Sequence, residues 1–159
     1  MWAYYAAVKG SYILVLWLDQ PHAGLQIGRL GRFAFAPGCY LYVGSAFGSG
    51  GLRSRLAYHQ RQAKARPHWH IDYLRAVTCL CEAWTVASDI RLECVWCKML
   101  ATHPEVNIPV HGFGSRDTGC AAHLFYLPRA GHDGRLTSTI LREIMHQPEP
   151  VALEVQRCH

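Results

Sequence analysis

Hydrophobic residues fall into short blocks along this chain, and glycine, proline or polar residues separate the blocks. Blocks of about five to nine residues that are rich in aliphatic and aromatic side chains are typical of β-strands. We therefore predict strands at 11–18, 39–43, 79–87 and 122–127, and two short strands joined by a tight turn within 24–35. The first strand, Ser11–Leu18, has almost no polar positions, which is typical of a buried strand.

Apolar positions at helical spacing replace this pattern elsewhere in the chain. We predict helices at 52–66, ending before Pro67, at 68–74, at 89–101 with Asp89 as N-cap, and at 135–146. We predict loops at 44–51 and 112–119 and a loose tail over the last dozen residues. Because the early strands form a local meander without a crossover helix, we expect an α+β fold with a small, mainly antiparallel sheet flanked by helices.

A length of 159 residues fits one domain with a hydrophobic core, and the composition, 50% hydrophobic and 17% charged, is globular. We expect 1–127 to form the main domain, and 128–159 to add a C-terminal helix and tail packed on it or trailing it. The chain has seven cysteines, no secretory signal at its start and no apolar run that could span a bilayer. These features suggest an intracellular, cytoplasmic protein without a membrane partner.

The net charge is +5, and much of the positive charge lies in one segment. Five basic residues occupy fourteen positions without an acidic residue among them: Arg53, Arg55, Arg61, Lys64 and Arg66. Such a cluster favours a polyanionic partner such as nucleic acid, although a solvated helix face has the same composition. A helical wheel of 52–66 places Arg53, Arg61 and Lys64 on the side of the helix that faces solvent. It places Arg55 beside the apolar face, which comprises Leu52, Leu56, His59 and Ala63.

The segment 42–59 combines residues that suit phosphate chemistry. Tyr42 ends a predicted strand, and the helix after the glycine-rich turn carries Arg55 and His59 four residues apart. Arginine suits a phosphate because its planar guanidinium offers two parallel donors and stays charged. A tyrosine hydroxyl can accept a proton where a cation lowers its pKa, and a carboxylate such as Glu93 can hold a divalent ion. We therefore predict an active site here that handles phosphate.

Two cysteine pairs, Cys79–Cys81 and Cys94–Cys97, have spacings that suggest zinc. The first pair occupies alternate positions of a predicted strand, and such side chains point to opposite faces. We therefore expect no structural zinc site, and we expect most cysteines to be buried as small hydrophobic residues.

The order of the candidate residues resembles the GIY-YIG nuclease superfamily. Gly10-Ser11-Tyr12 is similar to the first half of its motif, and Tyr42-Val43-Gly44 is similar to the second half, followed by Ser45, Arg55 and His59. Within it, the chain most resembles the DUF123 subfamily, a domain of unknown function found alone or fused to endonuclease III. The segments that carry this likeness are 38–46, 68–74, and Gly112-Phe113-Gly114-Ser115 followed by Cys120 and His123.

The chain also departs from these patterns. Ser11 and Val43 stand where the motif has isoleucine, and a hairpin between Pro21 and Pro37 lengthens the gap between the two halves. The segment Arg116-Asp117-Thr118 stands where the subfamily usually has Ser-Asp-Cys, so Cys120 is expected to be structural.

The resemblance implies a nuclease that hydrolyses phosphodiester bonds in DNA, in the context of DNA repair, with one Mg²⁺ or Mn²⁺ ion held by Glu93. It implies that Arg55 stabilises the charge of the transition state and that Tyr12 is the general base. Tyr42 would orient the water or the phosphate, and His59 would hydrogen-bond within the site or assist proton transfer. The expected contacts to nucleic acid are Ser45, Arg53, Arg61 and Lys64.

Two groups of polar residues lie outside the nuclease motif. The first group is His68, His70 and Asp72, and the second is Ser115, Asp117 and His123. We expect them to support the residues that contact the substrate, with a His–Asp hydrogen bond in the first group. A helix cap with core packing explains that first group equally well. Two other functions stay open: a non-catalytic nucleic-acid-binding module with the same fold, and a metal-independent enzyme or small-molecule binder built on the histidines.

Overall fold

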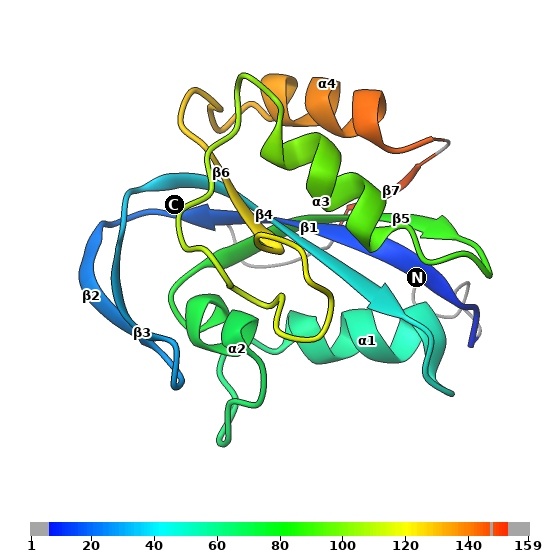
Figure 1. Cartoon of the computed structure of the whole chain (residues 1–159), viewed down its shortest axis with the longest axis horizontal. Coiled ribbons are helices and arrows are strands. Elements are labelled where there is room, and N and C mark those ends of the chain that lie inside the picture. The colour runs from blue at the N-terminus through cyan, green and yellow to red at the C-terminus, as the bar shows by residue number, and fades with distance from the viewer. Residues whose placement is uncertain (1–6, 147, 153–159) are drawn as a thin grey trace.

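The computed structural model describes residues 7–146 and 148–152, which form a sheet with helices on both faces (Figure 1). The elements in chain order are β1 (Gly10–Leu18), β2 (His22–Ile27), β3 (Gly31–Phe35), β4 (Gly38–Ala46), α1 (Gly51–Gln60), α2 (His70–Arg75), β5 (Cys79–Ala87), α3 (Glu93–Ala101), β6 (Leu124–Leu127), α4 (Arg135–Ile144) and β7 (Glu149–Ala152). The predicted α+β class is confirmed.

The main sheet has β1 at its centre, in the order β6-β4-β1-β5-β7, and its neighbouring strands are antiparallel. β2 and β3 form a separate hairpin, at the left of Figure 1. The predicted hairpin between Pro21 and Pro37 is therefore confirmed. The predicted meander is wrong, because β4 pairs directly with β1 and the hairpin stays outside the main sheet.

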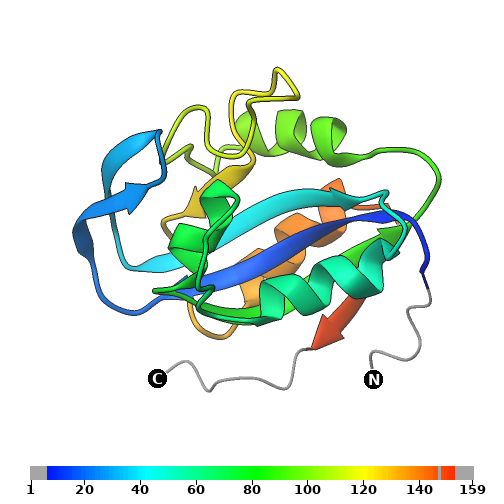
Figure 2. The same cartoon turned by 90° about the horizontal axis from the view of Figure 1, so that it is seen from below.

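The central place of β1 explains its lack of polar positions. Tyr12 and Leu14 pack into one core cluster with α1 and α2, while Ile13 and Val15 pack into a second cluster with α3 and α4. Figure 2 shows α1 and α2 in front of the sheet and α4 behind it. Both faces of β1 are covered, so neither face needs polar side chains.

Helix α1 ends at Gln60 instead of the predicted Arg66, because another side chain takes its last carbonyl groups. The buried guanidinium of Arg75 donates to the α1 carbonyl oxygens of His59 at 2.9 Å and Gln60 at 3.5 Å. A helix end leaves such carbonyls without intrahelical partners, and a cation satisfies them. Ala63, predicted on the apolar face, lies beyond the helix and is exposed.

Helix α3 starts at Glu93 instead of Asp89. The backbone N–H of Leu92 donates to Ser11 Oγ at 3.1 Å, so a hydroxyl from β1 sets the start of this helix. Helical spacing within 89–101 predicts an apolar face made of Leu92, Val95, Trp96 and Met99. In the structure the core-facing residues are Trp96, Cys97 and Leu100, whereas Val95 and Met99 are exposed, so the helix is rotated relative to that prediction.

The C-terminal segment packs against the rest of the chain. α4 buries Ile140, Leu141 and Ile144 in the cluster that also holds α3. β7 pairs with β5 in a segment where the sequence predicted a loose tail. The rest of that predicted tail, 153–159, lies outside the described residues. Within the described part of the chain, no helix is long and apolar enough to cross a membrane.

Candidate active site

Three residues of the predicted site lie together on the face of the sheet that α1 covers. Tyr12 on β1, Tyr42 on β4 and His59 on α1 are buried, and the Tyr12 hydroxyl lies 2.7 Å from His59 Nε2. The ring centroid of His59 lies 5.4 Å from that of Tyr12 and 5.9 Å from that of Tyr42. The antiparallel register causes this arrangement, because Tyr12 is opposite Gly44 and Tyr42 is opposite Leu14.

Gly44 provides the space for the Tyr12 hydroxyl. The sequence predicted a turn from Gly44 onward, but β4 continues to Ala46, so Gly44 is a strand residue. A Cβ atom at Gly44 would lie 2.4 Å from Tyr12 Oη and 2.5 Å from its Cζ. Gly44 belongs to the second half-motif, Tyr42-Val43-Gly44, and Tyr12 belongs to the first. The close packing of Tyr12 therefore requires a glycine at position 44.

We expect Gly44→Ala to destabilise the fold by about 1 to 3 kcal/mol, the usual cost of overpacking a core. The ring of Tyr12 is only 1% exposed and its hydroxyl bonds His59, so it has no free space to move into. The free energy of unfolding in denaturant measures the effect. Gly48→Ala is the matched control, because a Cβ there meets nothing within 4 Å. Equal stability of the two variants would contradict the close packing.

Arg55 is half-buried, and its guanidinium carbon lies 4.5 Å from the centroid of the Trp69 ring. This cation–π contact holds the charge in one place. Arg55 and Trp69 line a cavity of about 280 Å³ beside the glycine loop 48–51. Trp69 also lines a second cavity of about 180 Å³ with Tyr42 and His70. The charged group and the tyrosine therefore open onto neighbouring cavities that share one wall.

Burial keeps the tyrosines and the histidine of this site neutral. Desolvation, with a contribution from Tyr42, raises the pKa of Tyr12 well above its ordinary value, and the charge of Arg55 opposes this rise. Desolvation also raises the pKa of Tyr42. Desolvation and the charges of Lys64 and Arg55 lower the pKa of His59 to about 3. At neutral pH, Tyr12 therefore keeps its proton unless more positive charge comes close to it.

Glu93 lies in the first turn of α3, on the other face of the sheet, with 13% of its side chain exposed. Its Oε2 lies 3.8 Å from His123 Nδ1, and its Oε1 lies 3.9 Å from Arg91 Nη1. Its negative charge contributes to the raised pKa of both Tyr12 and Tyr42. The carboxylate thus contacts Arg91 and His123 directly and acts on the two tyrosines through its charge.

The residues predicted to contact nucleic acid differ in exposure. Arg53 and Arg61 are exposed as predicted, and Ser45 is half-buried with its Oγ 3.4 Å from Arg91 Nη1. Lys64 was predicted to point into water, and this is wrong. Its side chain is 6% exposed, and Nζ donates to the Arg61 carbonyl and lies 3.7 Å from an Asp72 oxygen. A paired and buried ammonium group is a poor phosphate contact.

Asp72 is a helix cap. Its Oδ2 accepts the backbone N–H groups of His68 at 2.8 Å and Trp69 at 3.0 Å, and the hydroxyl of Tyr58 at 2.5 Å. Desolvation alone would raise the pKa of this carboxyl, but these hydrogen bonds hold it below its ordinary value. The predicted His–Asp side-chain bond is wrong, because Oδ2 accepts from the backbone and Tyr58, His70 turns its Nδ1 to Gly114, and buried Oδ1 has no hydrogen-bond partner in the described part of the chain. The alternative, a helix cap with core packing, describes Asp72.

Two of the three remaining histidines, His70 and His123, hold the loop 112–119 against the site. His70 Nδ1 accepts the N–H of Gly114 at 2.9 Å. His123 Nδ1 lies 3.1 Å from the Val43 carbonyl oxygen, and its Nε2 lies 2.9 Å from the Thr118 hydroxyl. Of the other predicted supporting residues, Ser115 is buried in the loop, while His68 and Asp117 are exposed and line the cavity that Tyr42 also lines.

A family model described as "Domain of unknown function DUF123" matches residues 11–146. The chain belongs to the DUF123 family. The match extends from β1 to the residues just after α4, so it includes every residue of the site described above. Neither the curated proteins nor the solved structures contain a match to this chain.

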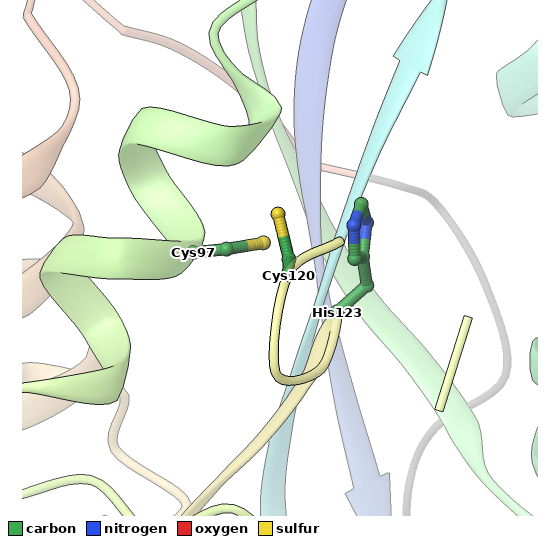
Figure 3. Close-up of side chains that lie close together, drawn as sticks. All are labelled: Cys97, Cys120 and His123. Atoms are coloured by element: carbon green, nitrogen blue, oxygen red, sulfur yellow. The ribbon is translucent and has the colours of Figure 1, made fainter. Parts of the chain in front are cut away.

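The DUF123 chain contains a second group of potential ligands beside Glu93. One potential ligand atom from each of Cys97, Cys120 and His123 lies within 4.8 Å of the other two, and Figure 3 shows Cys97 approaching from α3 and the other two side chains from the loop before β6. This cluster could bind a metal ion. The sequence did not predict this cluster, because Cys94–Cys97 was considered only together with Cys79–Cys81 as a candidate zinc site. The signal was the Cys-x-x-His spacing of Cys120 and His123.

Three further residues shape this DUF123 site and had no predicted role. Trp69 stacks on Arg55, Arg75 caps α1, and Arg91 lies beside Ser45 and Glu93. Trp69 lies between two predicted site residues, His68 and His70, which was the available signal. The positions of Arg75 and Arg91 depend on contacts distant in sequence.

Proposed function

We propose that this DUF123 domain is a metal-dependent nuclease that hydrolyses phosphodiester bonds in DNA. The observation that carries the proposal is the buried hydrogen bond of 2.7 Å between the Tyr12 hydroxyl and His59 Nε2. A tyrosine–histidine pair next to a fixed guanidinium provides a group that transfers protons and a group that binds phosphate. The mild excess of positive charge over the chain, +5, agrees with a polyanionic substrate.

Arg55 would bind the scissile phosphate. Its guanidinium is held by Trp69, so little side-chain freedom is lost when the phosphate arrives. Its charge stays fixed through the reaction, while negative charge builds up on the phosphate oxygens. Arg55 would therefore stabilise the transition state more than the bound substrate.

Tyr12 and His59 would handle the proton of the attacking water. With a pKa of about 3, His59 is neutral at any physiological pH, and a neutral ring nitrogen can accept the Tyr12 hydroxyl. Tyr12 would act as the general base when positive charge lowers its raised pKa. Arg55 supplies part of that charge already. Tyr42, whose side chain lines the neighbouring cavity, would orient the water or the phosphate.

Glu93 would hold the divalent ion. Mg²⁺ commonly keeps several waters and needs only one or two protein carboxylates, so a single partly exposed glutamate suits it. The neighbouring Arg91 side chain is 62% exposed and can move away from the carboxylate. A bound Mg²⁺ or Mn²⁺ ion supplies positive charge to the phosphate oxygens and lowers the pKa of nearby water. Its Oε2 lies 3.8 Å from His123 Nδ1, and that nitrogen lies 3.1 Å from the carbonyl oxygen of Val43, the residue after Tyr42, which supports a place for Glu93 beside the tyrosines.

A non-catalytic nucleic-acid-binding module is the second candidate. The exposed side chains of Arg53 and Arg61, outside the tyrosine cluster, favour it, because they could contact the phosphate backbone without chemistry. In that case, binding would need no divalent ion.

Arg55→Ala separates the two candidates. We expect it to lower the single-turnover rate of DNA cleavage with Mg²⁺ by roughly 10³-fold, as for other arginines that stabilise phosphoryl transfer. Arg53→Ala is the matched control, since it removes an exposed arginine from the same helix, and we expect weaker binding with nearly normal cleavage of bound DNA. Equal cleavage rates for the wild type and Arg55→Ala would refute the catalytic role. Metal-independent binding without cleavage would establish the second candidate.

A further inference from the structure

We propose that Cys94, Cys97, Cys120 and His123 form a structural Zn²⁺ site that joins the first turns of α3 to the loop before β6. The inference does not rest on the proposed nuclease activity. It concerns a different metal, held by different ligands, from the Mg²⁺ or Mn²⁺ ion assigned to Glu93.

The four residues have the spacing of a zinc site in two halves. Cys94-x-x-Cys97 lies at the start of α3, and Cys120-x-x-His123 lies at the entry to β6. Structural zinc sites commonly consist of two such pairs, with Cys₃His among the usual ligand sets. The fold brings these two pairs together although more than twenty residues separate them in the sequence.

The sulfur atoms already converge. Cys97, Cys120 and His123 each offer a ligand atom within 4.8 Å of the others, and Cys120 Sγ lies 3.0 Å from Cys94 Sγ. Zn–S bonds of about 2.3 Å in a tetrahedral site place neighbouring sulfurs about 3.8 Å apart. Small rotations of the cysteine side chains would therefore suffice. The half-buried position of Cys94 leaves it room to rotate.

The surroundings of His123 prepare one ring nitrogen for a metal. Nδ1 lies 3.1 Å from the Val43 carbonyl oxygen, which can only accept a hydrogen bond, so Nδ1 carries the hydrogen. Nε2 then carries a lone pair, which accepts a hydrogen bond from the Thr118 hydroxyl at 2.9 Å. Metal-bound histidines usually donate their other N–H to a carbonyl in this way. The Thr118 hydroxyl has a second acceptor, the Ser115 carbonyl at 3.4 Å, to which it could turn.

The ligand chemistry selects the metal. Three thiolates and one imidazole suit Zn²⁺, whereas Mg²⁺ and Mn²⁺ prefer oxygen ligands. The competing use of these cysteines is a disulfide between Cys94 and Cys120. A disulfide would use only two of the four side chains and would leave Cys97 and His123 without a shared purpose.

Zinc at this position would act on the proposed active site through structure. Glu93 precedes the ligand Cys94 in the chain, and its Oε2 lies 3.8 Å from Nδ1 of the ligand His123. The loop 112–119, which carries Gly114 against His70, ends next to Cys120. A bound zinc ion would therefore fix both the carboxylate and the loop beside Tyr42.

The metal content of the untagged, reduced full chain tests the proposal. We expect elemental mass spectrometry to find about one zinc ion per chain, as in other closed four-ligand sites. We expect Cys97→Ser and Cys120→Ser each to lose most of the zinc. Cys79→Ser combined with Cys81→Ser is the matched control and should keep it, because that pair lies on β5 outside the cluster. A wild type without zinc, or the same zinc content in both ligand variants, would overturn the proposal.

Cobalt binding tests the site even where a ligand variant fails to fold. After the wild-type chain has been treated with a chelator, added Co²⁺ should give the intense visible bands of tetrahedral coordination and a thiolate charge-transfer band, and Zn²⁺ should displace it. A weak octahedral spectrum would exclude the site. A Cys94–Cys120 disulfide in zinc-free protein purified without reductant would exclude it as well.

Discussion

Glu93→Gln is expected to lower the rate of DNA cleavage with Mg²⁺ by about 10³-fold or more, since a metal contributes several kcal/mol of charge stabilisation. Glutamine has the shape of glutamate but no charge, so it should fail to hold the ion. Because the contacts of its carboxylate with Arg91 and His123 are long, at 3.9 and 3.8 Å, the free energy of unfolding should change little. Single-turnover cleavage and denaturant unfolding measure the two effects.

The control for this variant is Glu143→Gln, which removes a carboxylate that is 57% exposed on α4. It should cleave like the wild type. The zinc content provides a second control, because Glu93→Gln leaves all four proposed zinc ligands in place. A Glu93→Gln variant that cleaves as fast as the wild type would remove Glu93 from the mechanism without affecting the zinc proposal.

Tyr12→Phe is expected to lower cleavage by roughly 10³-fold, within the range usual for loss of a general base. The change removes one oxygen and its hydrogen bond to His59 but keeps the buried ring. Tyr40→Phe is the matched control, because Tyr40 is buried in the same core cluster and its hydroxyl bonds only a backbone carbonyl in the described part of the chain.

The pH dependence of the rate identifies the role of Tyr12. Burial raises its pKa, so below that pKa the deprotonated fraction should rise about tenfold for each pH unit. The wild-type rate should therefore increase with pH, and Tyr12→Phe should lose this dependence. A variant with a uniformly lower rate and an unchanged slope would assign Tyr12 a purely structural role.

Local patterns in the sequence predicted much of the fold and the positions of Tyr42, Arg55 and His59, whereas Tyr12 entered the predicted site only through the family resemblance, which also assigned Glu93 as its metal ligand. The apolar blocks located the strands, since a buried strand such as β1 needs no information beyond its own residues. Helical periodicity placed Leu52, Leu56 and His59 on the buried face of α1, and all three are buried. It also placed Arg55 beside that face, where the structure has it half-buried.

The errors arose where distant residues decide the local structure. α1 ends early because the buried Arg75 takes carbonyl groups near its end, and no signal within α1 shows this. Lys64 lies beyond the end of α1, and its side chain is shielded from solvent because its ammonium group contacts Asp72 and the Arg61 carbonyl. The cysteine cluster needed the pairing of α3 with a loop more than twenty residues later. Such contacts depend on tertiary packing, which overrides local propensity.

The most direct test of the nuclease assignment is cleavage by the wild-type chain. End-labelled single-stranded, duplex and branched DNA should be incubated with Mg²⁺ or Mn²⁺ and, in parallel, with EDTA. We predict that the chain cuts at least one of these substrates with either metal ion and cuts none of them in EDTA. Binding without cleavage in both metals, or cleavage that persists in EDTA, would contradict a metal-dependent nuclease built on Tyr12, Arg55 and Glu93.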